Sequence, residues 1–168
     1  KHPEVRICLH IGVVCDHKRP DMRAARVNVQ SMDRETMRGL VSAAPVGRLA
    51  TVRRDGRPPV VPICFVVMEE VVYSAVDDKP KRHRHLQRVS NITATGTASL
   101  LVDEYHEDWS RLWWVRLDGQ ARLVDNTAET ERAIRSLSDK YPQYREQPPS
   151  GPVLAVDVER WVGWSART

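Results

Sequence analysis

The 168-residue sequence contains little cysteine and a single phenylalanine. Its three cysteines, Cys8, Cys15 and Cys64, are too sparse and odd in number for the disulfide framework of a small secreted domain. No apolar run reaches the roughly 18 residues that a membrane-spanning helix needs. Charges interrupt the apolar stretch near residue 10, so no signal peptide is predicted. These absences predict a cytoplasmic protein without a membrane partner.

An excess of charge of one sign is also missing. The chain has 26 Lys and Arg residues against 22 Asp and Glu residues, a net charge of +4. That excess is too small to indicate nucleic-acid binding. The most basic stretch, residues 77–88, has no interleaved aromatic residues on which bases could stack. We therefore expect no nucleic-acid partner.

The hydrophobic fraction of 41% predicts a globular chain. Residues 1–31 show neither a helical nor a strand periodicity, and the pattern sharpens only after Met32. We expect residues 1–31 to be a poorly ordered N-terminal extension and residues 32–168 to be the folded domain.

The extension contains two short Cys-x-His pairs, Cys8 with His10 and Cys15 with His17. Four ligands of these two types are the inventory of a zinc site, which is an open alternative for this segment. The C-x-H spacing is not that of a standard zinc finger, and the surrounding sequence offers little to fold around a metal. The sequence therefore predicts no metal site.

Three helices are indicated by capping residues and apolar spacing. Asp33 can cap the first helix, which ends before Pro45. Asp77 or Asp78 can cap a second, with Pro80 in its first turn and Leu86 and Val89 on its apolar side. Asn126 and Glu129 form a capping pair for the third, which Pro142 stops.

Six strands are predicted between these helices, joined by short turns at Asp55-Gly56 and Glu69-Glu70. Asp118-Gly119 breaks or kinks the fifth strand, and Pro62 places the second at an edge or a bulge. The strands are expected at residues 46–52, 59–67, 71–75, 97–102, 111–124 and 153–158. This order, without a βα rhythm, predicts a small, mainly β (α+β) antiparallel barrel with short peripheral helices.

A cluster of cations follows the third strand: Lys79, Lys81, Arg82, His83, Arg84, His85 and Arg88. Cations at the start of a helix are well placed to bind an anion, because the helix N–H groups and dipole point the same way. Arg can grip phosphate with two hydrogen bonds, while Lys supplies a mobile charge. A solvated basic face is the alternative interpretation.

Five tryptophans lie in the domain. Core packing is the expectation for Trp109 and Trp114, and for Cys64 in its apolar strand. Trp113 and Trp114 are neighbours on one strand and must face opposite sides, so one can pack the core while the other lines a cofactor pocket or a dimer interface.

Four segments together resemble the pyridoxamine 5'-phosphate oxidase-like (PPOX class) split-barrel flavoproteins. They are GRLATVRRDGRPPVVPICFVV, VVYSAVDDKPKRHRHLQRVSNI, TASLLVDEY and LWWVRLDGQARLV. Within that family, the sequence is most similar to the actinobacterial coenzyme F-420 (deazaflavin)-dependent oxidoreductases. The resemblance runs from about Met32 to the C-terminus. It implies a six-stranded antiparallel split β-barrel, the FMN-binding split barrel, assembled as a homodimer with cofactor at the subunit interface.

The resemblance also implies cofactor-binding residues. Lys79 and Lys81, with Arg82 beside them, match the phosphate-binding positions, and Arg48 matches a first-strand arginine that touches the cofactor. Tyr73 and Ser74 match the tyrosine and hydroxyl pair that ends the third strand. The remaining matches, Trp113, Trp161 and Trp164, are at positions near the cofactor ring.

The expected function is that of an oxidoreductase which binds coenzyme F-420 and transfers a hydride to or from a small organic substrate. The cofactor carries this chemistry, so no catalytic acid or base is assigned. Beyond its single phosphodiester, the deazaflavin tail carries carboxylates, which suits a basic cluster that continues past Lys81. Three alternatives stay open: an FMN-dependent oxidase, a heme-binding protein, and a cofactor-binding module without turnover.

Overall fold

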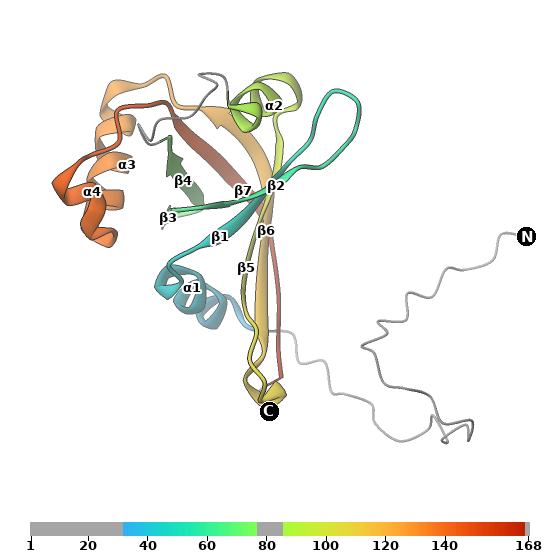
Figure 1. Ribbon diagram of the computed structural model, residues 1–168. Helices are drawn as coiled ribbons and strands as arrows, with labels where there is room; N and C mark the ends of the chain where they lie inside the picture. The colour runs from blue at the N-terminus through green and yellow to red at the C-terminus, as the bar shows by residue number, and fades with distance from the viewer. Residues whose placement is uncertain (1–31, 77–85, 167–168) are drawn as a thin grey trace, which may run out of the picture.

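The computed structural model describes residues 32–76 and 86–166. The described residues form one antiparallel sheet with short helices around it (Figure 1). The strands are β1 (Gly47–Thr51), β2 (Val60–Ile63), β3 (Val66–Met68), β4 (Val71–Ala75), β5 (Thr97–Glu104), β6 (Trp113–Leu123) and β7 (Val153–Ser165). The helices are α1 (Arg34–Ala43), α2 (Gln87–Thr95), α3 (Thr127–Lys140) and α4 (Pro142–Glu146), with a 3-10 turn at Trp109–Arg111.

The sheet is strongly curled. Its strand order is β2-β1-β5-β6-β7-β4-β3, so β2 and β3 lie at opposite edges. Yet only Cys64 and Phe65 separate these two strands in the chain. The three peptide units from Ile63 to Val66 span at most about 11 Å, so the two edges of the sheet must approach each other. The mainly β antiparallel half-barrel that was predicted is confirmed.

The strand count differs from the prediction because residues 59–67 do not form one strand. The chain leaves the sheet at Cys64 and Phe65 and begins a second strand at Val66. The Phe65 side chain is fully buried. Its backbone N–H donates to the Tyr141 hydroxyl, which also lies 2.9 Å from the Phe65 carbonyl oxygen and 3.1 Å from that of Pro45. Tyr141 thus satisfies backbone groups that no strand pairs, and its burial raises its pKa to about 12.

Alternation along the strands separates an inner from an outer face. Leu49, Leu100, Leu117 and Trp161 lie in register across β1, β5, β6 and β7, and all are buried in the main core. α1 adds Met37 and Val41 to this core. On the outer face a second cluster forms where Ala133 and Leu137 of α3 pack against strands β4 and β7.

Local signals located the helix starts well in two cases. The Asp33 carboxylate accepts a hydrogen bond from the Thr36 N–H at 2.9 Å, and the Asn126 side chain accepts one from the Glu129 N–H at 3.0 Å. Both predicted N-caps are therefore confirmed. Pro62 also lies in an edge strand, as predicted, paired with Arg48.

Three boundaries differ from the prediction. α2 begins at Gln87 with Leu86 in extended conformation as its N-cap, so Asp77 and Asp78 do not cap it. Pro142 ends α3 but also begins α4, since its fixed φ suits a first helical turn. Strand β7 continues to Ser165, well beyond the predicted Val158, because it pairs with β6 along its whole length.

Gly119 marks a bulge between β6 and β7. The pairing register shifts between Asp118 and Gly119, which confirms the predicted kink. A Cβ atom on Gly119 would lie 2.1 Å from the carbonyl oxygen of Asp157, so the two backbones approach more closely than any side chain allows.

The expected extension, residues 1–31, lies outside the described residues. Within residues 32–76 and 86–166, no helix is long and apolar enough to cross a bilayer.

Candidate functional site

The outer surface of β1, β2, β5, β6 and the C-terminal part of β7 carries the main candidate site, which we call the tryptophan face. Strand register builds it in rows: Arg48 lies beside Leu101 and then Arg116, and Asp103 lies beside Trp114 and then Trp164. The pocket on this face is lined by Arg48, Ala50, Val60, Ser99, Leu101, Asp103, Glu104, Tyr105, Trp109, Leu112, Trp113, Trp114, Arg116 and Trp164.

This pocket is large and mostly apolar, with a volume of about 930 Å³. Several of its large side chains face solvent: Val60 is 58% exposed, Trp109 53% and Tyr105 71%. A monomeric soluble protein rarely leaves such a continuous apolar surface open. The tryptophan face is therefore the main candidate surface for binding a ligand or a partner.

Its charged groups are held in ion pairs. Arg48 bonds Asp103, and Arg116 bonds Asp118 at 2.9 Å. The Asp118 carboxylate also accepts a hydrogen bond from the Ser99 hydroxyl at 2.7 Å. Partial burial opposes ionisation of Asp118, but these hydrogen bonds outweigh it and lower its pKa. The face thus presents oriented, neutralised charges around an apolar centre.

Three of the predicted cofactor contacts, Arg48, Trp113 and Trp164, come together at this pocket. Trp113 is 8% exposed, and its indole N–H donates to the Glu104 carboxylate at 3.0 Å. The core placement predicted for Trp109 and Trp114 is wrong, because Trp109 is largely exposed and Trp114 points outward beside Trp164.

Several residues of the tryptophan face escaped the sequence analysis, above all Leu101, Val60 and Trp114. A signal for them was present. In β5, Ala98, Leu100 and Val102 occupy the buried positions, which leaves Leu101 as an apolar residue on the opposite face. An apolar side chain on the outward face of an amphipathic strand indicates an interface.

A second pocket of about 580 Å³ lies where residues 77–85 leave and rejoin the described chain. Ser74 and Ala75 line it just before that segment, and Arg88 just after it, opposite Tyr141 and Tyr144. Cys64, predicted to be in the core, is half-buried and lines this pocket. Lys79, Lys81 and Arg82 fall outside the described residues.

The two pockets are joined by a third, of about 390 Å³. It shares Pro45 and Val46 with the Ser74 pocket, and Arg48 and Trp113 with the tryptophan face. The three pockets are therefore neighbours, in a row that runs from Ser74 and Arg88, past the start of β1, to the tryptophan face. We call this row of pockets the groove.

Tyr73 and Trp161 lie elsewhere, among none of the residues that line these three pockets. The buried Trp161 indole donates to Glu70 at 3.0 Å, and the Arg34 guanidinium lies 4.4 Å from its ring centre. It therefore fastens α1 to the sheet, although its contact with a cofactor remains a prediction.

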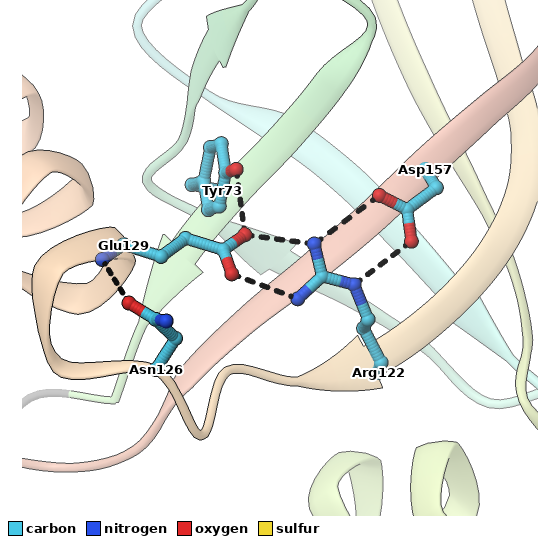
Figure 2. A network of polar contacts seen from close by, with 5 residues as sticks. All are labelled: Tyr73, Arg122, Asn126, Glu129 and Asp157. Atoms are coloured by element: carbon cyan, nitrogen blue, oxygen red, sulfur yellow. Dashed lines mark hydrogen bonds and ion pairs between the residues drawn. The ribbon is translucent and has the colours of Figure 1, made fainter.

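Tyr73 belongs to a polar network that joins four elements (Figure 2). Its hydroxyl donates to Glu129 at 2.8 Å, and Arg122 bonds both Glu129, at 2.7 Å, and Asp157, at 2.9 Å. Burial, followed by the Glu129 contact, raises the pKa of Tyr73 to about 12. Hydrogen bonds from Arg122 and then Tyr73 lower the pKa of Glu129. The network fixes α3 to β4, β6 and β7.

Replacing Glu129 by Gln should lower the free energy of unfolding by about 1–2 kcal/mol at pH 7, because the Arg122 guanidinium loses one of its two carboxylate partners. The Glu129 pKa lies below its ordinary value of 4.5 in the folded state. Its contribution is therefore present above about pH 4.5 and disappears as the pH falls through the folded pKa. Urea denaturation at pH 7 and between pH 3 and 5 measures this.

The matched control is Glu131→Gln, since Glu131 is exposed on the same helix. It should change stability by less than about 0.5 kcal/mol. Equal stabilities of the two variants at pH 7 would show that the network contributes nothing.

No group of His, Cys, Asp and Glu side chains suited to a metal occurs within residues 32–76 and 86–166. The zinc alternative at Cys8, His10, Cys15 and His17 lies outside the described residues.

Comparison with known proteins identifies the family to which this chain belongs. The sequence profile of pyridoxamine 5'-phosphate oxidase matches residues 33–165, which include nearly every described element. The chain belongs to the pyridoxamine 5'-phosphate oxidase family. The family resemblance inferred from the four sequence segments is thereby confirmed. A search of curated proteins finds no match.

Solved structures share the family's fold. A conserved hypothetical protein from Mycobacterium tuberculosis has a TM-score of 0.68 at 18% identity, covering 84% of this chain and 89% of that one. An FAD-binding protein from Mesorhizobium loti has a TM-score of 0.62 at 20% identity, covering 81% and 96%. The FAD-binding protein from Mycobacterium smegmatis has a TM-score of 0.57 at 19% identity, covering 82% and 98%. Because all three identities are 20% or lower, these similarities show only that this chain has the same fold as those structures.

Proposed function

We propose that this protein is an oxidoreductase that binds a phosphorylated flavin-type cofactor along the groove, with coenzyme F-420 as the preferred cofactor. The observation that supports the proposal is the row of neighbouring pockets that makes up the groove. Ser74 and Arg88, which flank the basic residues 77–85 in the sequence, line one end of it, and the apolar tryptophan face forms the other. A phosphorylated flavin has two matching parts: an anionic chain, which suits the basic end of the groove, and a flat aromatic ring, which suits the apolar end.

The residues fit such a group at both ends. Lys79, Lys81 and Arg82 supply cations next to the Ser74 pocket along the chain. Trp114 and Trp164 supply flat apolar surfaces at the other end, with Arg48 held at their side by Asp103. Two solved relatives of the same fold are FAD-binding proteins by name, which supports a flavin-type ligand here.

A bound flavin or deazaflavin would supply the hydride transfer to or from a small organic substrate. The protein's own contribution would be position and environment. The indole side chains of the tryptophan face would exclude water from the ring, and the Arg48–Asp103 and Arg116–Asp118 pairs would present oriented dipoles to it. No side chain is assigned as proton donor.

We also propose that a second copy of the chain covers the tryptophan face, which gives a homodimer with cofactor at the interface. The open apolar surface supports this arrangement, since a C2 dimer buries the same patch of both subunits. The Leu101 variant considered below tests it.

Cofactor preference is decided by titrating one pure sample with F-420, FMN, FAD and heme. Quenching of tryptophan fluorescence gives the affinities, and a Soret band reports heme. F-420 should bind most tightly. Tighter binding of FMN or FAD would assign a conventional flavoprotein, and binding of heme alone would overturn the proposal.

Lys79→Ala and Lys81→Ala should each weaken cofactor binding by roughly 10- to 150-fold, the effect of losing a charge-assisted hydrogen bond of about 1.5–3 kcal/mol. We expect the free energy of unfolding to change little, since the effect of each substitution is assigned to the bound cofactor. The same titration at two salt concentrations measures the effect, and the wild-type affinity should fall with salt. Arg135→Ala on the exposed surface of α3 is the control. Equal affinities for all three variants and the wild type would remove the phosphate assignment.

A further inference from the structure

A separate pocket lies between α2 and the loop that joins β1 to β2. Figure 1 shows the helix beside this loop. The pocket has a volume of about 300 Å³, and its lining includes Arg53, Arg54, Asp55, Gln87, Ser90 and Asn91. It shares no lining residue with the groove proposed for the cofactor.

Two cations without a carboxylate partner line this pocket. The Arg53 Nε atom is buried and has no hydrogen-bond partner among the residues that the structure describes. Neither Arg53 nor Arg54 forms an ion pair within residues 32–76 and 86–166. A buried N–H of a charged guanidinium without a partner costs free energy. An incoming acceptor would remove that cost once the guanidinium turns this N–H toward the pocket.

The carboxylate in the pocket is already engaged by a third arginine. Asp55 accepts a hydrogen bond from the Arg57 N–H at 3.1 Å, and the Arg57 guanidinium Nε lies 3.8 Å from its other oxygen. The pocket therefore contains two unpaired cations and one carboxylate that Arg57 partly neutralises.

The floor of the pocket is fixed by buried hydrogen bonds. Asn91 is 2% exposed, and its side-chain amide donates to the Thr51 hydroxyl at 2.9 Å. Its carbonyl oxygen accepts from the Gln87 amide at 2.8 Å, which leaves the second N–H of that amide for another acceptor. Thr95 ties the other end of α2 to the Val52 carbonyl at 3.1 Å. These hydrogen bonds thus hold α2 rigidly against the start of the loop that joins β1 to β2.

We propose that this pocket is an anion-binding site that takes a phosphate or carboxylate group. Arg53 and Arg54 supply the charge, since guanidinium groups match the geometry of oxyanions. The Gln87 amide and the Ser90 hydroxyl supply neutral donors in the same lining. The site is argued from described residues alone, and it does not require that the protein bind a flavin.

The test is a titration of the full-length, 15N-labelled protein with inorganic phosphate, at constant ionic strength maintained with chloride. The arginine Nε–Hε signals in a 15N–1H correlation spectrum report each guanidinium separately, and Arg53→Lys identifies the Arg53 signal. That signal should shift with a saturating dependence on phosphate. Arg54→Gln should weaken the phosphate affinity by roughly tenfold.

Arg135→Gln is the control, because it removes the same charge at an exposed residue of α3 that does not line this pocket. It should leave the phosphate affinity unchanged. Small linear shifts of equal size at all exposed arginines would overturn the proposal, as would equal losses of affinity in Arg54→Gln and Arg135→Gln.

A second titration identifies the source of the anion. If F-420 competes with phosphate at the Arg53 signal, the site binds an anionic group of the cofactor tail. If phosphate affinity is unchanged while F-420 is bound, the site belongs to a separate anionic ligand. Failure of F-420 to bind at all would contradict the proposed function and leave the phosphate result standing.

Discussion

Gly119→Ala is expected to lower the free energy of unfolding by at least about 3 kcal/mol. The new Cβ would lie 2.1 Å from the Asp157 carbonyl oxygen and 2.9 Å from its carbonyl carbon. Both are backbone atoms, so no side chain can rotate away, and β6 must separate from β7. That pairing runs from Trp113 opposite Ser165 to Leu123 opposite Leu154, and it is the longest in the sheet.

Urea denaturation of the purified variants measures the effect. Gly39→Ala is the control, because an added Cβ there meets nothing within 4 Å on the exposed side of α1. It should stabilise the protein by about 0.5–1 kcal/mol through the better helix propensity of alanine. A Gly119→Ala protein as stable as the wild type would show that the bulge can move along the strand.

Leu101→Arg is expected to convert the proposed homodimer into a monomer and to abolish cofactor binding at micromolar protein concentration. Leu101 lies directly between Arg48 and Arg116 in the strand register, so the variant places three arginines side by side. In a covered interface the new charge would be buried without a partner, which costs several kcal/mol in each subunit. In the monomer it would face solvent, because Leu101 lies on the open outer face of the sheet.

Light scattering should give about twice the 19.2 kDa chain mass for the wild type and the single mass for Leu101→Arg. Ile134→Arg, a half-buried apolar residue on α3, is the control and should leave the dimer intact. Thermal denaturation verifies that Leu101→Arg still folds. A wild-type monomer that binds its cofactor would overturn the interface proposal, as would a dimer that survives Leu101→Arg.

The features that the sequence predicts correctly are those determined by neighbouring residues. The N-caps at Asp33 and Asn126 need only the next three residues, and the kink at Gly119 needs only a glycine in a strand. The division of residues 59–67 into two strands depends on Tyr141, which is 76 residues away from Phe65. No local pattern could reveal that hydroxyl, and the strand count was wrong for this reason.

In the candidate site, too, some residues could be identified from the sequence, while others depend on contacts between segments far apart in the chain. Arg48, Trp113 and Trp164 were identified through the family resemblance, and the pairing of β1, β5, β6 and β7 brings them together. The outward position of Trp114 was missed because periodicity separates the two faces of a strand without saying which face a helix covers. Trp109 lies in a 3-10 turn, where strand periodicity does not apply. Arg53 and Arg54 precede the predicted Asp55-Gly56 turn, and they line a pocket only because α2 lies beside that loop.

The distribution of indoles gives the protein a built-in optical sensor. Four of its five tryptophans, Trp109, Trp113, Trp114 and Trp164, border the same pocket, while Trp161 lies under α1. Most of the intrinsic emission therefore originates within a few ångströms of whatever covers that surface. A bound chromophore that absorbs in the near ultraviolet should quench it by energy transfer, and a purely protein partner should shift it to the blue. Unlabelled protein can thus distinguish the two kinds of occupancy in a single emission scan.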